Sequence, residues 1–91
     1  MKPHSPGPGQ PYLLAQTAMA KLKSAVHMVL SDAGDAGIRN VDIGRLLGIH
    51  RGHDDRQHEG HISRTLLAIM EAEGVAEQDK TTTLWRLRRS P

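Results

Sequence analysis

The chain contains no cysteine and no phenylalanine, and its 91 residues include a single tryptophan and a single tyrosine. The absence of cysteine excludes disulfide bonds, cysteine-ligated zinc and thiol catalysis. It also fits a reducing, intracellular setting. Because aromatic side chains are so rare, we expect a core built from Leu, Ile, Val, Met and Ala.

Long apolar runs are also lacking. No stretch approaches the roughly 20 apolar residues that span a membrane, and no secretory signal is visible. The sequence therefore predicts no membrane partner and a cytoplasmic location, on the nucleoid or in a nucleus. A chain of 91 residues is expected to form one small domain. Because such a domain buries only about 60–65% of its unfolded surface, we do not expect a deep catalytic cleft.

The chain has only a small excess of positive over negative charge. The net charge is +2 and the isoelectric point is near 9.4, which favours polyanionic partners only mildly. Arginine supplies eight of the 12 cations. Its planar guanidinium suits paired contacts to phosphate and guanine better than lysine does.

The chain divides into a leader and one domain. Residues 1–10 hold three of the five prolines and predict a disordered leader, and residues 11–91 form the domain. Residues 11–33 predict a first helix, with an apolar stripe that includes Leu14, Ala18, Leu22, Val26, Val29 and Leu30. Gly34 and Gly37 end it, and Ile38 is an isolated apolar residue that suits a very short strand.

Two further helices are expected. Asn40 is a good N-cap for a helix over 41–47 that Gly48 stops. A third helix starts at His61 and is stopped by Gly74 in a left-handed conformation. Its apolar stripe is predicted to contain Ile62, Leu66, Ile69, Met70, Ala72 and Val75, and its other face His61, Arg64, Thr65, Ala68 and Glu71.

The C-terminal part predicts a β-hairpin. Residues 75–78 suit a short strand, residues 79–82 a polar turn, and residues 83–88 an alternating strand. Thr83, Trp85 and Leu87 share one face of that strand, and we expect Trp85 and Leu87 to cap the core. The predicted fold class is therefore mainly α with a small β-hairpin.

This order of elements resembles a winged helix-turn-helix domain. The segments that carry the resemblance are 38–48, 62–67, 73–78 and 84–87, and it covers roughly residues 14–88. It implies a three-helix bundle plus a wing that binds double-stranded DNA, with the third helix in the major groove and the hairpin on the backbone.

The same resemblance implies a set of DNA contacts. They are His61, Ser63, Arg64 and Thr65 on the third helix, and Lys80, Thr81, Thr82 and Arg86 on or beside the wing; the position of Arg39 before the second helix adds a backbone contact. In this reading the protein is a small transcriptional regulator, or the DNA-recognition module of a larger enzyme such as a restriction system. A homodimer or a larger protein partner stays open.

The alternative is a winged-helix module for protein–protein interaction, in which the same helix face docks on protein. DNA binding requires four basic residues to converge on one face, namely Arg64, Lys80, Arg86 and Arg88. The acidic connector and Glu71, Glu73 and Glu77 must lie away from that face. The sequence does not fix that segregation.

The connector between the second and third helices is rich in metal-binding residue types. His50, His53, His58 and His61 alternate with Asp54, Asp55 and Glu59, and imidazole with carboxylate can bind zinc or nickel. No helix holds a histidine pair at the i, i+4 spacing, so we predict a polar loop and no metal. No phosphate loop or catalytic triad pattern is present either, so we predict no cofactor and no enzymatic activity.

Overall fold

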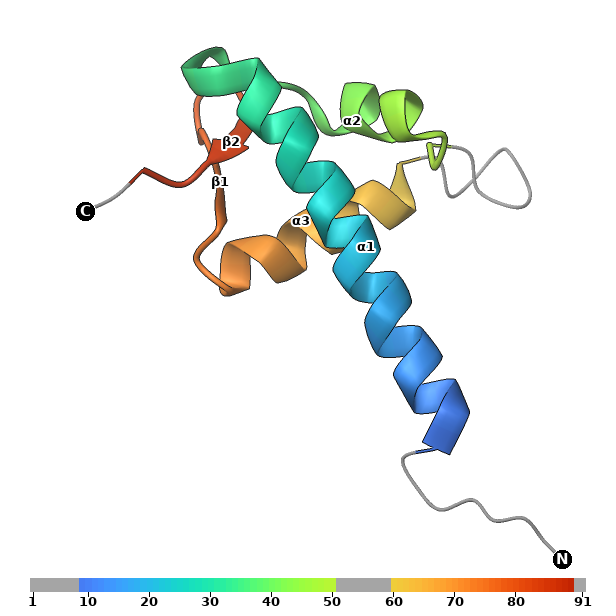
Figure 1. Ribbon diagram of the computed structural model, residues 1–91. Helices are drawn as coiled ribbons and strands as arrows, with labels where there is room; N and C mark the ends of the chain where they lie inside the picture. The colour runs from blue at the N-terminus through green and yellow to red at the C-terminus, as the bar shows by residue number, and fades with distance from the viewer. Residues whose placement is uncertain (1–8, 51–59, 90–91) are drawn as a thin grey trace, which may run out of the picture.

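The computed structural model describes residues 9–50 and 60–89. Over these residues the chain forms the helices α1 (Gly9–Ala33), η1 (Gly34–Ala36, a 3₁₀ turn), α2 (Asn40–Leu47) and α3 (His61–Ala72), and the strands β1 (Ala76–Gln78) and β2 (Trp85–Leu87). The two strands pair antiparallel in one small sheet (Figure 1). The prediction of a mainly helical domain with a small hairpin is confirmed.

Helix α1 begins at Gly9, earlier than the predicted boundary at Pro11. The rest of the predicted leader, residues 1–8, lies outside the described residues. The N-terminal half of α1 extends away from the other elements (Figure 1), so Leu14 is 67% exposed and Ala18 is exposed too. Their predicted place in the core is therefore wrong.

The reason lies in the lengths of the helices. At 1.5 Å per residue, the 25 residues of α1 span about 37 Å, whereas the 12 residues of α3 span about 18 Å. The shorter elements cover only the C-terminal half of α1. Within residues 9–50 and 60–89, no helix combines the length and apolar character that crossing a membrane requires.

The core is almost entirely aliphatic, as expected from the scarcity of aromatic residues. Its buried members are Val26, Leu30, Ile43, Leu66, Leu67, Met70, Ala76 and Trp85. Partly buried Leu22 and Leu87 pack against them. Trp85 is 6% exposed, which confirms its predicted burial in the core.

The apolar stripe of α3 is rotated from its predicted position. Ile62 was expected in the core but is 42% exposed, whereas Leu67 is fully buried. The buried line runs through Ser63, Leu66, Leu67 and Met70. A hydroxyl residue occupies the first of these positions because it has a polar partner on α2, described below.

Helices α2 and α3 end close to the glycines predicted to stop them. Gly48 and Gly74 both adopt positive φ, as predicted. After Gly74, the backbone N–H of Val75 donates to the carbonyl of Met70 at 2.9 Å, and Val75 packs on the core.

The hairpin is tied to the segment that precedes α2. Gln78 pairs with Trp85 and Ala76 with Leu87. On the other side of β2, Ile38 and Trp85 exchange two backbone hydrogen bonds of 2.8 and 2.9 Å, so the short strand expected at Ile38 is present as a single bridge. This bridge fixes the start of α2 relative to the hairpin.

Candidate functional site

A buried polar contact joins the first turns of α2 and α3. The Ser63 hydroxyl donates to Oδ1 of Asn40 at 2.7 Å, and Nδ2 of Asn40 donates to the carbonyl of Gly60 at 3.1 Å. This contact bears on two predictions. Arg39, rather than Asn40, occupies the N-cap position of α2 and makes no side-chain cap bond. Ser63 is 0% exposed, so it belongs to the packing, which does not suit the DNA contact predicted for it.

Small residues allow this close approach of the two helices. A Cβ at Gly60 would lie 2.9 Å from Nδ2 of Asn40, and the φ of +77° at Gly60 also disfavours a side chain. A Cβ at Gly44 would lie 3.1 Å from the Ser63 hydroxyl and 3.1 Å from the backbone of His50. The N–H of Gly60 donates to the carbonyl of His50 at 2.6 Å. The two ends of the connector therefore meet beside the Asn40–Ser63 contact.

A surface depression lies next to this contact, where α2, α3 and the hairpin meet. It is lined by Arg39, Asn40, Val41, Arg64, Gln78, Thr83 and Trp85. Two predicted DNA-contact residues, Arg39 and Arg64, thus share one depression although they are far apart in the sequence. The Asn40–Ser63 hydrogen bond and the Ile38–Trp85 bridge hold its walls together.

Arg39 is exposed at the start of α2. Its guanidinium donates to both carboxylate oxygens of Asp42, at 3.1 and 3.3 Å. This hydrogen bond, with the charge of the same carboxylate, raises the pKa of Arg39. The contact also orients the side chain and offsets part of its charge.

The outward face of α3 is as predicted. His61, Arg64, Thr65 and Ala68 are all exposed, and Glu71 ends the face. Within the part of the chain that the structure describes, Arg64 has no acidic partner at ion-pair distance. Its charge therefore remains available beside the N-terminal end of α3, where the helix dipole also favours an anion.

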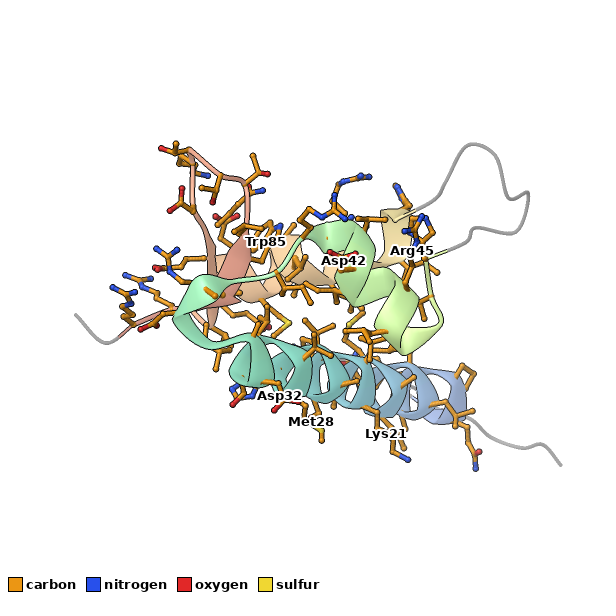
Figure 2. The ribbon with its side chains drawn as sticks, turned by 90° about the horizontal axis from the view of Figure 1, so that it is seen from above. Lys21, Met28, Asp32, Asp42, Arg45 and Trp85 are labelled. Atoms are coloured by element: carbon orange, nitrogen blue, oxygen red, sulfur yellow. The ribbon has the colours of Figure 1, made fainter. Side chains whose placement is uncertain are left out.

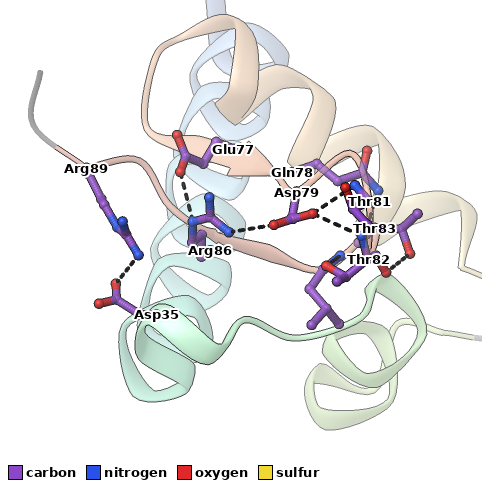
Figure 3. A network of polar contacts seen from close by, with 10 residues as sticks. Asp35, Glu77, Gln78, Asp79, Thr81, Thr82, Thr83, Arg86 and Arg89 are labelled. Atoms are coloured by element: carbon purple, nitrogen blue, oxygen red, sulfur yellow. Dashed lines mark hydrogen bonds and ion pairs between the residues drawn. The ribbon is translucent and has the colours of Figure 1, made fainter.

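The turn of the hairpin is organised by Asp79 (Figure 3). Oδ1 of Asp79 accepts the backbone N–H groups of Thr81 and Thr82, at 2.8 and 2.9 Å. These bonds, that of Thr82 foremost, lower the pKa of Asp79. The side chains of Lys80, Thr81 and Thr82 are exposed at the tip, and Nζ of Lys80 lies 4.0 Å from a carboxylate oxygen of Glu71.

Arg86 does not join the other predicted contact residues. Its guanidinium lies 2.8 Å from Glu77 and 3.6 Å from Asp79, and only 21% of its side chain is exposed (Figure 3). Two carboxylates neutralise it, and it does not line the depression. This position suits a structural role in the hairpin better than the DNA contact predicted for Arg86. The separation of acidic from basic residues that DNA binding requires is absent here, because Glu77 lies directly against Arg86.

The structure adds residues that the sequence did not indicate. Gln78 lines the depression, and its side-chain amide donates to the carbonyl of Thr83 at 3.0 Å. Thr83 has a φ of 65° and is exposed, whereas Trp85, which was expected on the same strand face, is buried. The run of threonines after Asp79 indicated a turn, but no pattern showed that Gln78 and Thr83 would face Arg64.

The histidine-rich connector falls mostly outside the described residues, including His53, His58, Asp54, Asp55 and Glu59. Among the residues that the structure does describe, no group of His, Asp and Glu side chains is arranged to hold a metal ion.

Comparison of the chain with protein-family models, with curated proteins and with solved structures gave no match.

Proposed function

We propose that this protein is a winged helix-turn-helix domain that binds double-stranded DNA, with α3 in the major groove and the hairpin as the wing beside the backbone. The observation that carries the proposal is the depression in which Arg39 and Arg64 come together with Gln78 and Thr83. It combines two guanidinium groups with an amide and a hydroxyl. These are the groups that proteins use on phosphates and on base edges.

The outward face of α3 supports a major-groove position. Exposed His61, Arg64 and Thr65 occupy its first turns, and residues at the N-terminal end of such a helix reach base edges. Arg64 is the residue suited to bond a guanine, because no acidic residue among those described neutralises it and the core does not use it. Arg39 sits at the edge of the same depression and is suited to a phosphate.

The wing contributes less charge than the sequence suggested. Arg86 is neutralised by Glu77 and Asp79, and Lys80 lies near Glu71. The exposed hydroxyls of Thr81 and Thr82 remain as donors to phosphate oxygens. We therefore assign the discriminating contacts to α3 and a minor, sequence-independent contribution to the hairpin.

A protein–protein interaction module is the second candidate, and the charge arrangement favours it. Glu71 ends the outward face of α3 and Glu77 lies on the hairpin, so acidic groups flank the proposed DNA surface. Such a mixture of charges is common on surfaces that dock protein. In that case α3 would present the same exposed residues to a polypeptide.

A salt titration of binding to random duplex DNA separates the two functions. The affinity of a DNA-binding domain falls steeply with salt, with a slope set by the number of phosphates neutralised. Chemical-shift mapping at low salt should move the amides of Arg39, Arg64, Gln78 and Thr83 together. The absence of salt-dependent duplex binding, with these four amides unmoved, would favour the protein-docking function.

A further inference from the structure

The outer face of α1 carries a stripe of residues that the fold does not use. Lys21, Met28 and Asp32 are exposed and project from α1 on the side away from α2 (Figure 2). Ala25 lies between them on the same stripe and is half-buried. Met28 is 67% exposed, so its side chain is available for contact with another molecule.

The stripe is complementary to a second copy of itself that runs in the opposite direction. Lys21, Ala25, Met28 and Asp32 follow one another at spacings of four, three and four residues, a sequence of spacings that is the same from either end. When two copies of α1 lie antiparallel with the two-fold axis between Ala25 and Met28, each Lys21 faces an Asp32. Each small Ala25 then faces a large Met28.

The charges select this register over the others. Antiparallel pairing can also place Lys21 against Lys21 or Asp32 against Asp32, and both of those arrangements are repulsive. When the axis lies between Ala25 and Met28, each Lys21 instead faces an Asp32. Of these three registers, this is the only one in which the facing charges attract.

An apolar depression extends the same surface. It lies on the flank of α1 that turns towards α2 and is lined by Val29, Asp32, Ala33, Ile38, Leu46 and Leu47. Asp32 therefore belongs both to the end of the stripe and to the edge of this depression. In the register described, the N-terminal half of the second copy passes Asp32 and continues towards this depression. That half carries the exposed Leu14 on the same stripe as Lys21.

We propose that the outer face of α1 binds a second copy of this chain in an antiparallel, two-fold arrangement. Met28 and Leu14 supply the apolar contact, and the two Lys21–Asp32 pairs fix the register, because exposed ion pairs contribute little affinity by themselves. The surface is narrow compared with a standard interface, so we expect a dissociation constant on the order of micromolar.

This proposal is independent of DNA binding. The depression of Arg39 and Arg64 lies outside the stripe, and dimerisation is measured without nucleic acid. A failure of either proposal therefore leaves the other one standing.

Charge reversal and charge exchange test the register. Sedimentation equilibrium of the full chain should show a concentration-dependent dimer. Lys21→Asp and Asp32→Lys should each weaken it by about tenfold or more, because each creates two like-charge pairs. The double variant Lys21→Asp/Asp32→Lys restores opposite charges and should dimerise like the parent. Lys80→Glu, an equal change of charge on the hairpin, is the matched control and should have no effect.

Disulfide cross-linking provides a second readout, because the chain has no cysteine of its own. Under oxidation, a mixture of the Ala25→Cys and Met28→Cys variants should give more covalent dimer than either variant alone. A parent chain that stays monomeric at millimolar concentration would overturn the proposal. It would also be overturned by single charge variants that dimerise like the parent, or by a folded double variant that fails to recover.

Discussion

The hydroxyl of Ser63 donates a 2.7 Å hydrogen bond to the side-chain oxygen of Asn40, and this bond joins the first turn of α3 to the first turn of α2. Arg64 follows Ser63 and Arg39 precedes Asn40, so the buried pair sets the position of one guanidinium relative to the other. The relative position of Arg39 and Arg64, which we propose to bind DNA, thus depends on a buried hydrogen bond that is not part of the DNA-binding surface.

Removing this contact should destabilise the domain. We expect Ser63→Ala to lower the free energy of unfolding by about 1–3 kcal/mol, because the amide oxygen of Asn40 loses a buried donor. Thr65→Ala, an exposed change on the same helix, should stay within about 0.5 kcal/mol of the parent. Urea unfolding of both variants measures the difference. Equal stabilities would mean that the buried bond contributes nothing.

Trp85→Ala should cost about 3–5 kcal/mol, a large share of the stability of a small domain. Trp85 fills the core where α1, α3 and the sheet meet, and the same residue carries the bridge to Ile38. Leu46→Ala is the control, because Leu46 is exposed. A cooperative Trp85→Ala variant with nearly the parent melting temperature would contradict the placement of the indole.

The hairpin turn should loosen in acid. The Thr82 and Thr81 N–H groups lower the pKa of Asp79, so the unfolded chain binds this proton more readily than the folded one does. The stabilising contribution is complete above the ordinary aspartate pKa of about 4 and is lost as the pH falls through the lower folded value. The amide shifts of Thr81 and Thr82 should report this transition, and Asp79→Asn should abolish it. Shifts that do not change in acid would argue against the turn geometry.

A chelator should leave both the melting temperature and duplex binding unchanged, because we expect no preformed metal site among the histidines of the connector. Stoichiometric zinc in the purified protein, together with a large loss of stability on chelation, would contradict this prediction.

Lys80→Ala should weaken binding to all duplexes alike and reduce the salt slope by about one unit, as expected of a phosphate contact. Its neighbour Glu71 offsets part of the charge, so the slope can fall by less than that. A change in sequence preference in this variant would instead place the hairpin on the bases.

Apolar periodicity and glycine positions predicted much of the fold from the sequence. The order of helices and hairpin, the stops at Gly48 and Gly74, and the burial of Trp85 all follow from local patterns. The phase of α3 does not, because Ser63 takes a buried position that only its long-range partner Asn40 makes acceptable. The preference of asparagine for helix N-caps led to the incorrect prediction that Asn40 caps α2.

The candidate site was less predictable than the fold. The exposed face of α3 with Arg64 was expected, but the neutralisation of Arg86 by Glu77 and Asp79 depends on cross-strand pairing and on the turn. Likewise, Leu14 is exposed because α1 extends beyond the shorter elements that pack against it. The spacing of residues within one element shows neither the ion pairs of Arg86 nor the exposure of Leu14.

Duplex binding by Arg64→Ala tests the proposed function most directly, with Arg88→Ala as the matched control. The sequence placed Arg88 with the residues that converge on DNA, but this exposed arginine lies beside Gly74, at the end of α3 opposite Arg64. Arg64→Ala should lose about 1–3 kcal/mol on a preferred sequence and less on random duplex, and Arg88→Ala should bind like the parent. Both variants should melt like the parent, because neither residue lies in the core. If Arg64→Ala kept the affinity and sequence preference of the parent, α3 would not read DNA.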